Sequence, residues 1–257
     1  MVIQRRHVYP KSQSRSVERQ GDAEGHVGHH PPWLKQAPSL VGSKLRRSRV
    51  VRLVHRETKL NLDGIAIPTG AAAAGALDVA TAYASPALLN HSVRAYLWAA
   101  GYGNHHRIDY DPELLYVAAL LHDLGLTAEF DSHTVAFETA GGHLAWAFAA
   151  GAGWPVPRRN RLLDVIVLHM RDDVPPTIDP EAHLLQIAVS LDVSGRRPDA
   201  FPDAYKAQVL GRYPRLGFGA EFVKLCTAQA ERKPDSAAAE LIRSGVADRV
   251  AANPLDR

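Results

Sequence analysis

The chain has 257 residues, of which 46% are hydrophobic and 22% charged, a composition that allows a sizeable buried core. Its single cysteine, Cys226, excludes an internal disulfide framework and a cysteine-rich zinc module. The net charge is only +3, and no run of about 18 apolar residues predicts a membrane-spanning helix. The first residues also lack the apolar segment of a secretory signal. We therefore expect a soluble, cytoplasmic protein.

Charge is distributed unevenly along the chain. Residues 1–60 contain 13 Lys and Arg against 4 Asp and Glu, whereas residues 61–257 contain 17 against 23. The first segment is rich in Gly, Ser, Pro and His, a composition that buries too little apolar surface to offset the entropy of ordering. We expect residues 1–60 to form a disordered basic extension. A nucleic-acid or membrane-surface arm is the less favoured alternative, because the basic residues show no aromatic interleaving.

From residue 61 onward the sequence pattern is helical. Asp111–Glu113 and Asp179–Glu181 both read Asp-Pro-Glu, with an aspartate N-cap, a proline at the first helical position and an acid near the positive end of the helix dipole. Each leads into an apolar run that closes on a glycine, Gly125 or Gly195. Apolar periodicity predicts further helices at 72–84, 86–101, 134–150, 158–170, 202–211, 217–232 and 236–252. Residues 61–257 are therefore expected to form one all-α domain.

Polar side chains interrupt the apolar faces of five of these predicted helices. A buried imidazole or carboxylate needs a partner, or its burial costs several kcal/mol. A lone histidine is usually a satisfied core residue, but five helices with such residues together indicate a shared partner. Nitrogen and oxygen donors without thiolate suit Zn²⁺, Fe²⁺ or Mn²⁺. The residues concerned are His91, His122, Asp123, His143, His169 and Asp192.

The adjacent residues His122 and Asp123 indicate where such an ion would lie. Neighbouring side chains on a helix diverge by about 100°, so both reach one ion only if it lies beside the end of the helix. Two histidines and two aspartates would provide four ligands, neutralise a divalent ion and leave a position for water.

The order His91, His122-Asp123, Asp192 resembles that of the HD-domain superfamily of metal-dependent hydrolases, over about residues 62–240. Finer features resemble one branch, the cyanamide-hydratase-like HD proteins. A bare His-Asp dipeptide carries no weight, whereas an ordered series does. The series consists of Asn90-His91-Ser92-Val93-Arg94, Leu121-His122-Asp123-Leu124-Gly125-Leu126, Phe137-Glu138 before Gly141-Gly142, Leu168-His169, Leu191-Asp192-Val193-Ser194-Gly195, Tyr213-Pro214-Arg215-Leu216 and Lys233-Pro234.

The resemblance implies a compact multi-helix HD-domain bundle that binds one divalent metal ion, Zn²⁺ or Fe²⁺, with Mn²⁺ as a further option. His143 and His169 stand where dinuclear members of the superfamily have extra ligands, so a second ion stays open. Mononuclear members keep substrate-contacting histidines at these positions. The implied metal ligands are His91, His122, Asp123 and Asp192.

The branch implies metal-assisted addition of water to a small polar substrate, as in the conversion of cyanamide to urea. Glu138, His143 and His169 are the candidates for proton transfer. Glu138 and His143 lie five residues apart, so they point in different directions on a helix and do not share one task. Glu138 could equally hold a neighbouring helix. Apolar walls of the pocket are expected from Leu126, Phe130, Phe137 and Trp146.

Two other functions stay open. A metal-dependent phosphohydrolase acting on a nucleotide or phosphomonoester needs cationic groups around the developing charge. No Lys or Arg occurs from Ile108 to Pro157, and Leu126 stands where phosphodiesterases of the superfamily often carry lysine. Arg94 and Arg171 are the residues that could still bind phosphate. The third function, a regulatory module with an inactive HD core, is disfavoured by the complete set of metal-binding residues.

For partners, we expect a small-molecule substrate, no specific nucleic acid and no membrane. The sequence leaves open whether the chain forms a homo-oligomer.

Overall fold

The computed structural model describes residues 60–257, so the expectation of a disordered extension over residues 1–60 lies outside the described residues except for Leu60. Within this range the chain forms ten α-helices and four short 3-10 helices, and no strand. The all-α prediction is confirmed. The helices are α1 (Ala71–Tyr83), α2 (Pro86–His106), α3 (Pro112–Leu121), α4 (Phe137–Gly151), α5 (Val156–Leu168), α6 (Pro180–Ser194), α7 (Asp203–Arg212), α8 (Phe218–Arg232), α9 (Ala237–Arg243) and α10 (Val246–Ala251), with 3-10 helices η1 (Leu62–Gly64), η2 (Leu124–Leu126), η3 (Pro198–Ala200) and η4 (Pro254–Asp256).

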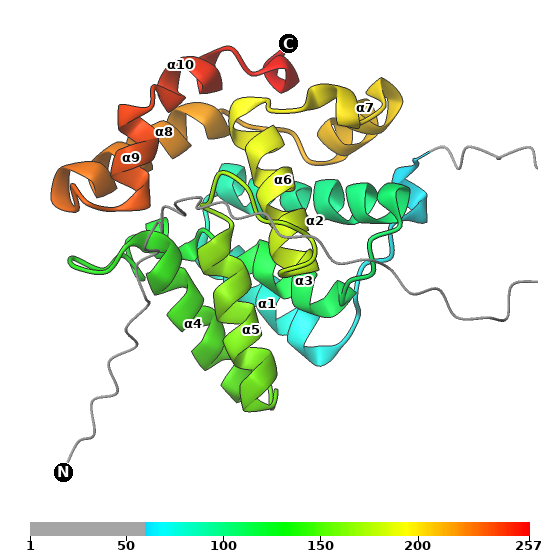
Figure 1. The fold of residues 1–257 in the computed structure, drawn as a ribbon, viewed down its shortest axis with the longest axis horizontal. Helices are drawn as coiled ribbons and strands as arrows, with labels where there is room; N and C mark the ends of the chain where they lie inside the picture. Colours follow the sequence, from blue (N-terminus) through cyan, green and yellow to red (C-terminus); the bar gives the residue numbers. More distant parts are fainter. Residues whose placement is uncertain (1–59) are drawn as a thin grey trace, which may run out of the picture. The chain divides into compact units, whose positions relative to one another are not determined.

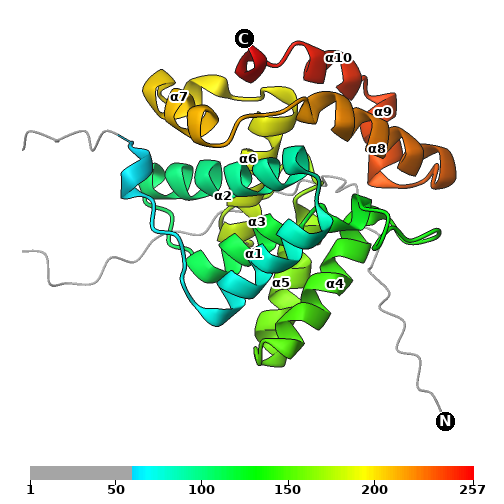
Figure 2. The same ribbon diagram turned by 180° about the vertical axis from the view of Figure 1, so that it is seen from behind.

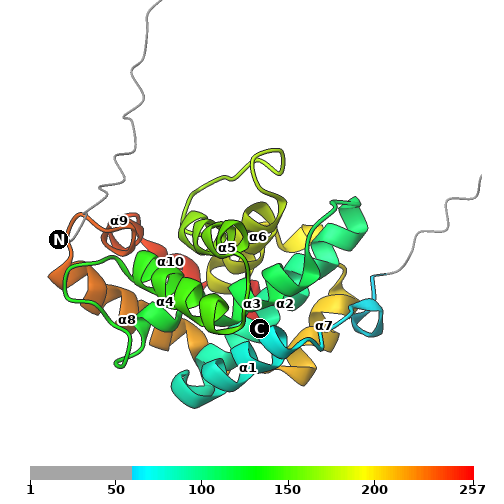
Figure 3. The ribbon, with the colours of Figure 1, turned by 90° about the horizontal axis from the view of Figure 1, so that it is seen from below.

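The long helices α2 and α6 cross in the middle of this helical domain (Figure 1). Helices α1, α3, α4 and α5 pack below α2, and α7 to α10 lie above it; the view from behind shows the same layers (Figure 2). Seen from below, α5 lies beside both α4 and α6 (Figure 3). Among the described residues, no helix is both long and apolar enough to span a membrane.

Helix α3 is the centre of the core. Its residues from Leu114 to Leu121 are all buried, as are Ala95 to Ala100 of the neighbouring α2. Burial of this apolar surface is the main force that holds the layers together. Because α3 is buried on every side, a polar residue at its end is placed inside the domain, and that residue is His122.

The two Asp-Pro-Glu sequences begin helices as predicted. Asp111 accepts hydrogen bonds from the main-chain nitrogens of Glu113 and Leu114, and Asp179 accepts one from Ala182. The structure also brings the two motifs together, because buried Glu181 accepts a hydrogen bond from the Asp111 main-chain nitrogen. The helix starts of α3 and α6 are thereby joined, which aligns the two helices that carry His122 and Asp192.

Glycines explain where the helix boundaries differ from the prediction. Helix α2 continues past Gly101 to His106, so this glycine does not end the helix. It allows close packing instead, since a Cβ atom there would lie 2.7 Å from the Tyr205 hydroxyl oxygen. The predicted helix 236–252 is wrong as a single element. It breaks into α9 and α10 at Gly245, whose φ of 75° is left-handed. Both short helices bury apolar residues, so the periodicity continues across the break and conceals it.

Gly125, the glycine after His122-Asp123, makes a close contact and does not cap a helix. A Cβ atom there would collide with the main-chain oxygen of Phe137 at the start of α4. We expect Gly125→Ala to lower the free energy of unfolding by about 1–3 kcal/mol, because the backbone must shift. Gly211→Ala is the matched control, since no atom lies within 4 Å of its Cβ position; it should change stability by less than about 1 kcal/mol. Urea unfolding measures both, and equal effects would contradict this account of Gly125.

Candidate metal centre

Helix ends converge on one buried point between the layers. His122 is the C-cap residue of α3, with Asp123 directly after it, and His169 is the C-cap residue of α5. His91 lies in the second turn of α2, and Asp192 lies near the end of α6. All five side chains are buried. The core therefore holds a group of ionisable residues that are almost entirely shielded from bulk solvent.

Three of these residues bring metal-donor atoms close together. The Nε2 atoms of His91 and His122 are 3.2 Å apart. Asp123 Oδ2 lies 3.2 Å from His122 Nε2 and 3.4 Å from His91 Nε2. Across residues 60–257 this is the one group of three or more such donors, and its atoms lie within 4.8 Å of one another.

The other ring nitrogen of each histidine has its own partner. His91 Nδ1 lies 2.7 Å from Asp192 Oδ2, and His122 Nδ1 lies 2.7 Å from the Ala119 carbonyl oxygen. A carboxylate or carbonyl oxygen only accepts, so Nδ1 carries the proton on both rings, and a neutral ring presents an Nε2 lone pair to the centre. Second-sphere oxygens orient metal-binding histidines in this way. Both rings are therefore arranged to bind a cation.

The carboxylate of Asp123 lacks partners of its own. Both of its oxygens are buried without a hydrogen bond, although the imidazoles of His91 and His122 are nearby. Burial raises the pKa of Asp123, but the charge of His122 and contacts with both histidines outweigh it and lower the pKa overall. An orphaned anion between two imidazole nitrogens is a fitting site for a divalent cation. The residues present therefore fit a metal ion.

This environment shifts the pKa values of His91 and His169 in opposite directions. Burial lowers the pKa of His91, but its contacts with Asp123 and Asp192 outweigh burial and raise it. Burial, followed by the nearby charge of His122, lowers the pKa of His169 to about 4. Its Nδ1 is paired with the Ile166 carbonyl oxygen, and its Nε2 lies 3.9 Å from Asp123 Oδ1. His169 is thus a neutral imidazole beside the donor group.

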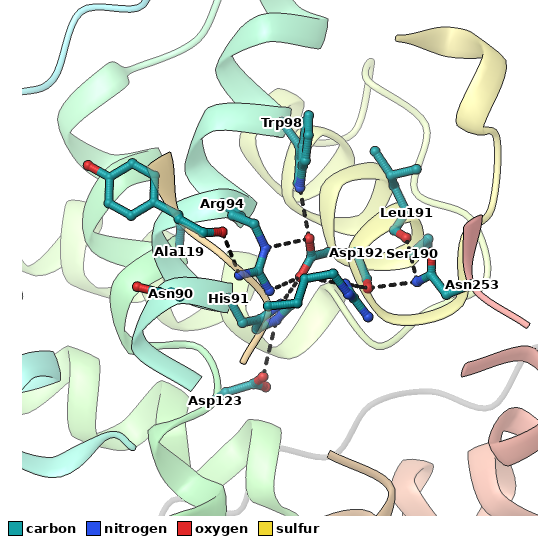
Figure 4. Close-up of polar contacts among 12 residues, drawn as sticks. Asn90, His91, Arg94, Trp98, Ala119, Asp123, Ser190, Leu191, Asp192 and Asn253 are labelled. Carbon is teal, nitrogen blue, oxygen red and sulfur yellow. Dashed lines mark hydrogen bonds and ion pairs between the residues drawn. The ribbon is translucent and has the colours of Figure 1, made fainter. Parts of the chain in front are cut away.

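Asp192 lies behind His91 and outside the group of three. Its Oδ1 accepts hydrogen bonds from Arg94 Nε and Trp98 Nε1, both at 2.9 Å, and its Oδ2 accepts one from Arg94 Nη2 at 2.8 Å (Figure 4). In Figure 4, Asp123 approaches His91 from the side opposite Asp192. The structure therefore gives Asp192 the role of orienting His91, and direct ligation by Asp192 stays a prediction.

Residues around Asp192 and His91 support the site although the sequence pattern gives them no such role. Arg94 was considered as a phosphate ligand, but it is fully buried and bonded to Asp192 and to the carbonyl oxygens of Tyr213 and Pro214. It is therefore not available to a substrate. Phe218 stacks on His91 with ring centroids 4.1 Å apart. Arg94 and Arg215 both lie in sequence motifs that resemble the HD family, and this resemblance was the signal that could have indicated these contacts.

A cavity of about 430 Å³ opens beside the donor group, within the size range of small-molecule sites. The expected walls are wrong: Leu126, Phe130, Phe137 and Trp146 do not line it, and its walls come from α6, from α8 to α10 and from residues 169–172 after α5. Three exposed arginines also line the cavity, together with the exposed Asp172, which lies 3.9 Å from Arg196 as an ion pair. The lining includes His91, His122, Asp123, His169, Met170, Arg171, Val189, Val193, Arg196, Phe222, Leu241, Val246 and Arg249.

The remaining two candidate residues lie apart from this cavity. His143 is exposed on α4 and lines neither the cavity nor the donor group, so the structure gives no support to a second ion held by His143 and His169. Glu138 is buried, its Oε2 has no hydrogen-bond partner, and burial raises its pKa. It lines a neighbouring cavity of about 420 Å³ that shares Met170 and Arg171 with the first.

Comparison with known families identifies this region. Residues 88–193 match the family model of the HD domain. The match contains the whole donor group together with His169 and Asp192. A search of curated proteins finds no match to the chain. This match and the His-His-Asp group support the resemblance to the HD-domain superfamily of metal-dependent hydrolases that the sequence indicates.

The donor group predicts how metal binding responds to substitution. We expect one divalent ion per chain and its loss in His122→Ala and Asp123→Asn, which remove donor atoms. Asp192→Asn separates the two roles of that residue: a supporting carboxylate weakens binding about 10–100-fold, whereas a lost ligand abolishes it. Metal content after dialysis and competition with a chelator measure both effects. Asp203→Asn, an exposed residue paired with Lys206, is the control. Unchanged metal content in Asp123→Asn would contradict the assignment.

Proposed function

We propose that the chain is a metal-dependent enzyme that adds water to a small polar substrate, with conversion of cyanamide to urea as the first candidate. One observation carries this proposal: the orphaned carboxylate of Asp123 and the two imidazoles beside it line a cavity large enough for a small molecule. The resemblance of the sequence phrases to cyanamide-hydratase-like proteins supplies the choice of reaction.

A divalent ion at this site would lower the pKa of water and so supply a hydroxide nucleophile at neutral pH. The residues then have separate tasks. His91, His122 and Asp123 would hold the ion, and Asp192 would orient His91. His169 lines the cavity with its Nε2 3.9 Å from Asp123 Oδ1, a position from which it would pass a proton from the attacking water to the substrate nitrogen. Hydroxide adds to the nitrile carbon, that nitrogen gains the proton, and tautomerisation gives urea.

Glu138 is the second proton carrier in this proposal. Its Oε2 has no hydrogen-bond partner, and burial raises its pKa, which suits a carboxyl group that carries a proton. Because it lines the neighbouring cavity, the exchange would pass through water in the space that both cavities border. His143 has no part in this reaction, since it is exposed on the outer face of α4.

A phosphohydrolase is the second candidate, and one observation favours it. Arg171, Arg196 and Arg249 all line the cavity, and guanidinium groups bind phosphate well. The gap in basic residues from Ile108 to Pro157 does not describe the cavity, which takes its cations from other parts of the chain.

Two features rank water addition to a less charged group first. The three arginines are exposed, and buried apolar residues such as Val189, Phe222 and Val246 line the inner walls. Phosphoryl transfer needs cationic groups at the reacting centre. The cavity also has room for a substrate larger than cyanamide, so cyanamide serves as a probe of the reaction type.

A comparison of His169 with His143 tests the proton-transfer step. We expect His169→Gln to keep the bound ion and to lower kcat by about 10²–10⁴-fold, because a proton carrier is lost. His143→Gln is the matched control and should change neither metal content nor kcat. Steady-state kinetics on metal-loaded proteins measure both variants. Equal activity of His169→Gln and the wild type would remove His169 from the mechanism.

A substrate panel tests the proposed reaction. We expect release of urea from cyanamide that depends on added Zn²⁺ or Fe²⁺ and is absent in His122→Ala. Little turnover of nucleotides or p-nitrophenyl phosphate is expected under the same conditions. The reverse ranking would establish the second candidate. If neither class reacts while the ion is bound, cyanamide-type hydration is wrong for this chain.

A further inference from the structure

Residues 253–256, which follow α10, lie against the end of α6. Asn253 is buried, and its Nδ2 donates to the main-chain oxygen of Asp192 at 3.0 Å and to that of Leu191 at 3.4 Å (Figure 4). The last carbonyl oxygens of a helix have no partner within the helix. Asn253 therefore supplies hydrogen bonds at the very residue whose carboxylate orients His91.

Asp256 reaches the same residue through Arg215. Arg215 donates from Nε and Nη2 to the two carboxylate oxygens of Asp256. Its Nη1 donates to the main-chain oxygen of Asp192 at 2.6 Å and lies 3.5 Å from Asp192 Oδ2. One guanidinium thus links Asp256 to both the main chain and the side chain of Asp192. The Arg215 guanidinium also lies over Phe218, the ring that stacks on His91.

The fit between this segment and α6 is close. Gly195 ends α6 with a left-handed φ of 66°. A Cβ atom at Gly195 would collide with Pro254 Cδ and lie 3.1 Å from Asn253 Oδ1. The segment therefore occupies the space directly over the end of α6, and there is no room for a side chain between them.

We propose that residues 253–256 position the metal centre: Asn253 and Asp256, the latter through Arg215, fix Asp192 and thereby the orientation of the His91 ring. The inference rests on the metal centre of the proposed function. Asn253 and Asp256 are positioning residues, since neither touches the donor group. Displacing the segment weakens metal binding although every ligand is present.

Asp256 offers the sharpest test, because its side chain is 44% exposed and the fold does not depend on burying it. We expect Asp256→Asn to raise the metal Kd about tenfold, the lower end of the effect of second-sphere changes. Asp256→Glu keeps the charge and should restore most of the affinity. Asp203→Asn, which breaks an exposed ion pair with Lys206, is the matched control and should leave the Kd unchanged. Chelator competition gives the Kd of each folded protein.

A second variant disturbs the segment from the opposite side. Gly195→Ala pushes Pro254 away and should raise the metal Kd in the same way. The Tm of the metal-free proteins distinguishes positioning from simple helix capping. A lower Tm with an unchanged Kd in both variants would show that the segment only caps α6 and would overturn the proposal. A wild-type chain that binds no ion would instead overturn the proposed function, and the positioning role with it.

Discussion

The buried ion pair between Arg94 and Asp192 is the interaction on which the site depends. Neither side chain is exposed, and removing one partner of such a pair costs about 3–5 kcal/mol, because the other charge stays buried alone. The pair joins α2 to α6, and Trp98 and His91 complete the shell of Asp192. This shell fixes the proton on His91 Nδ1 and so directs Nε2 toward His122 and Asp123.

The donor group itself is arranged for binding at the expense of stability. Asp123 has two buried oxygens without hydrogen bonds, whereas Asp192, which is equally buried, is fully paired. Proteins tolerate such local conflicts mainly at functional sites. This contrast distinguishes Asp123, whose free oxygens can bind a metal ion, from Asp192, whose paired oxygens orient His91.

The sequence predicted the helices and the polar positions well, because both follow from local rules. The N-cap residues Asp111 and Asp179, each followed by a proline, indicate where helices begin. The polar pair His122 and Asp123 is recognisable because it follows an apolar run. The cavity walls could not be predicted, since Phe222 and Val246 come from later helices that reach the site only through tertiary packing. Two predicted helix boundaries were wrong for different reasons: α2 continues past Gly101, which packs against Tyr205, and the predicted helix 236–252 breaks at Gly245, which adopts a left-handed conformation. Arg94 was misassigned because its partner, Asp192, lies 98 residues away.

X-ray absorption spectroscopy of the metal-loaded protein tests the central claim most directly, because it reports the atoms around the ion. The account predicts a shell containing two imidazole nitrogens at about 2.0–2.1 Å and carboxylate oxygen at about 2.0–2.2 Å. The imidazole signal should fall by half in His91→Ala. A shell of oxygen atoms alone, or one that is identical in His91→Ala and the wild type, would contradict the account.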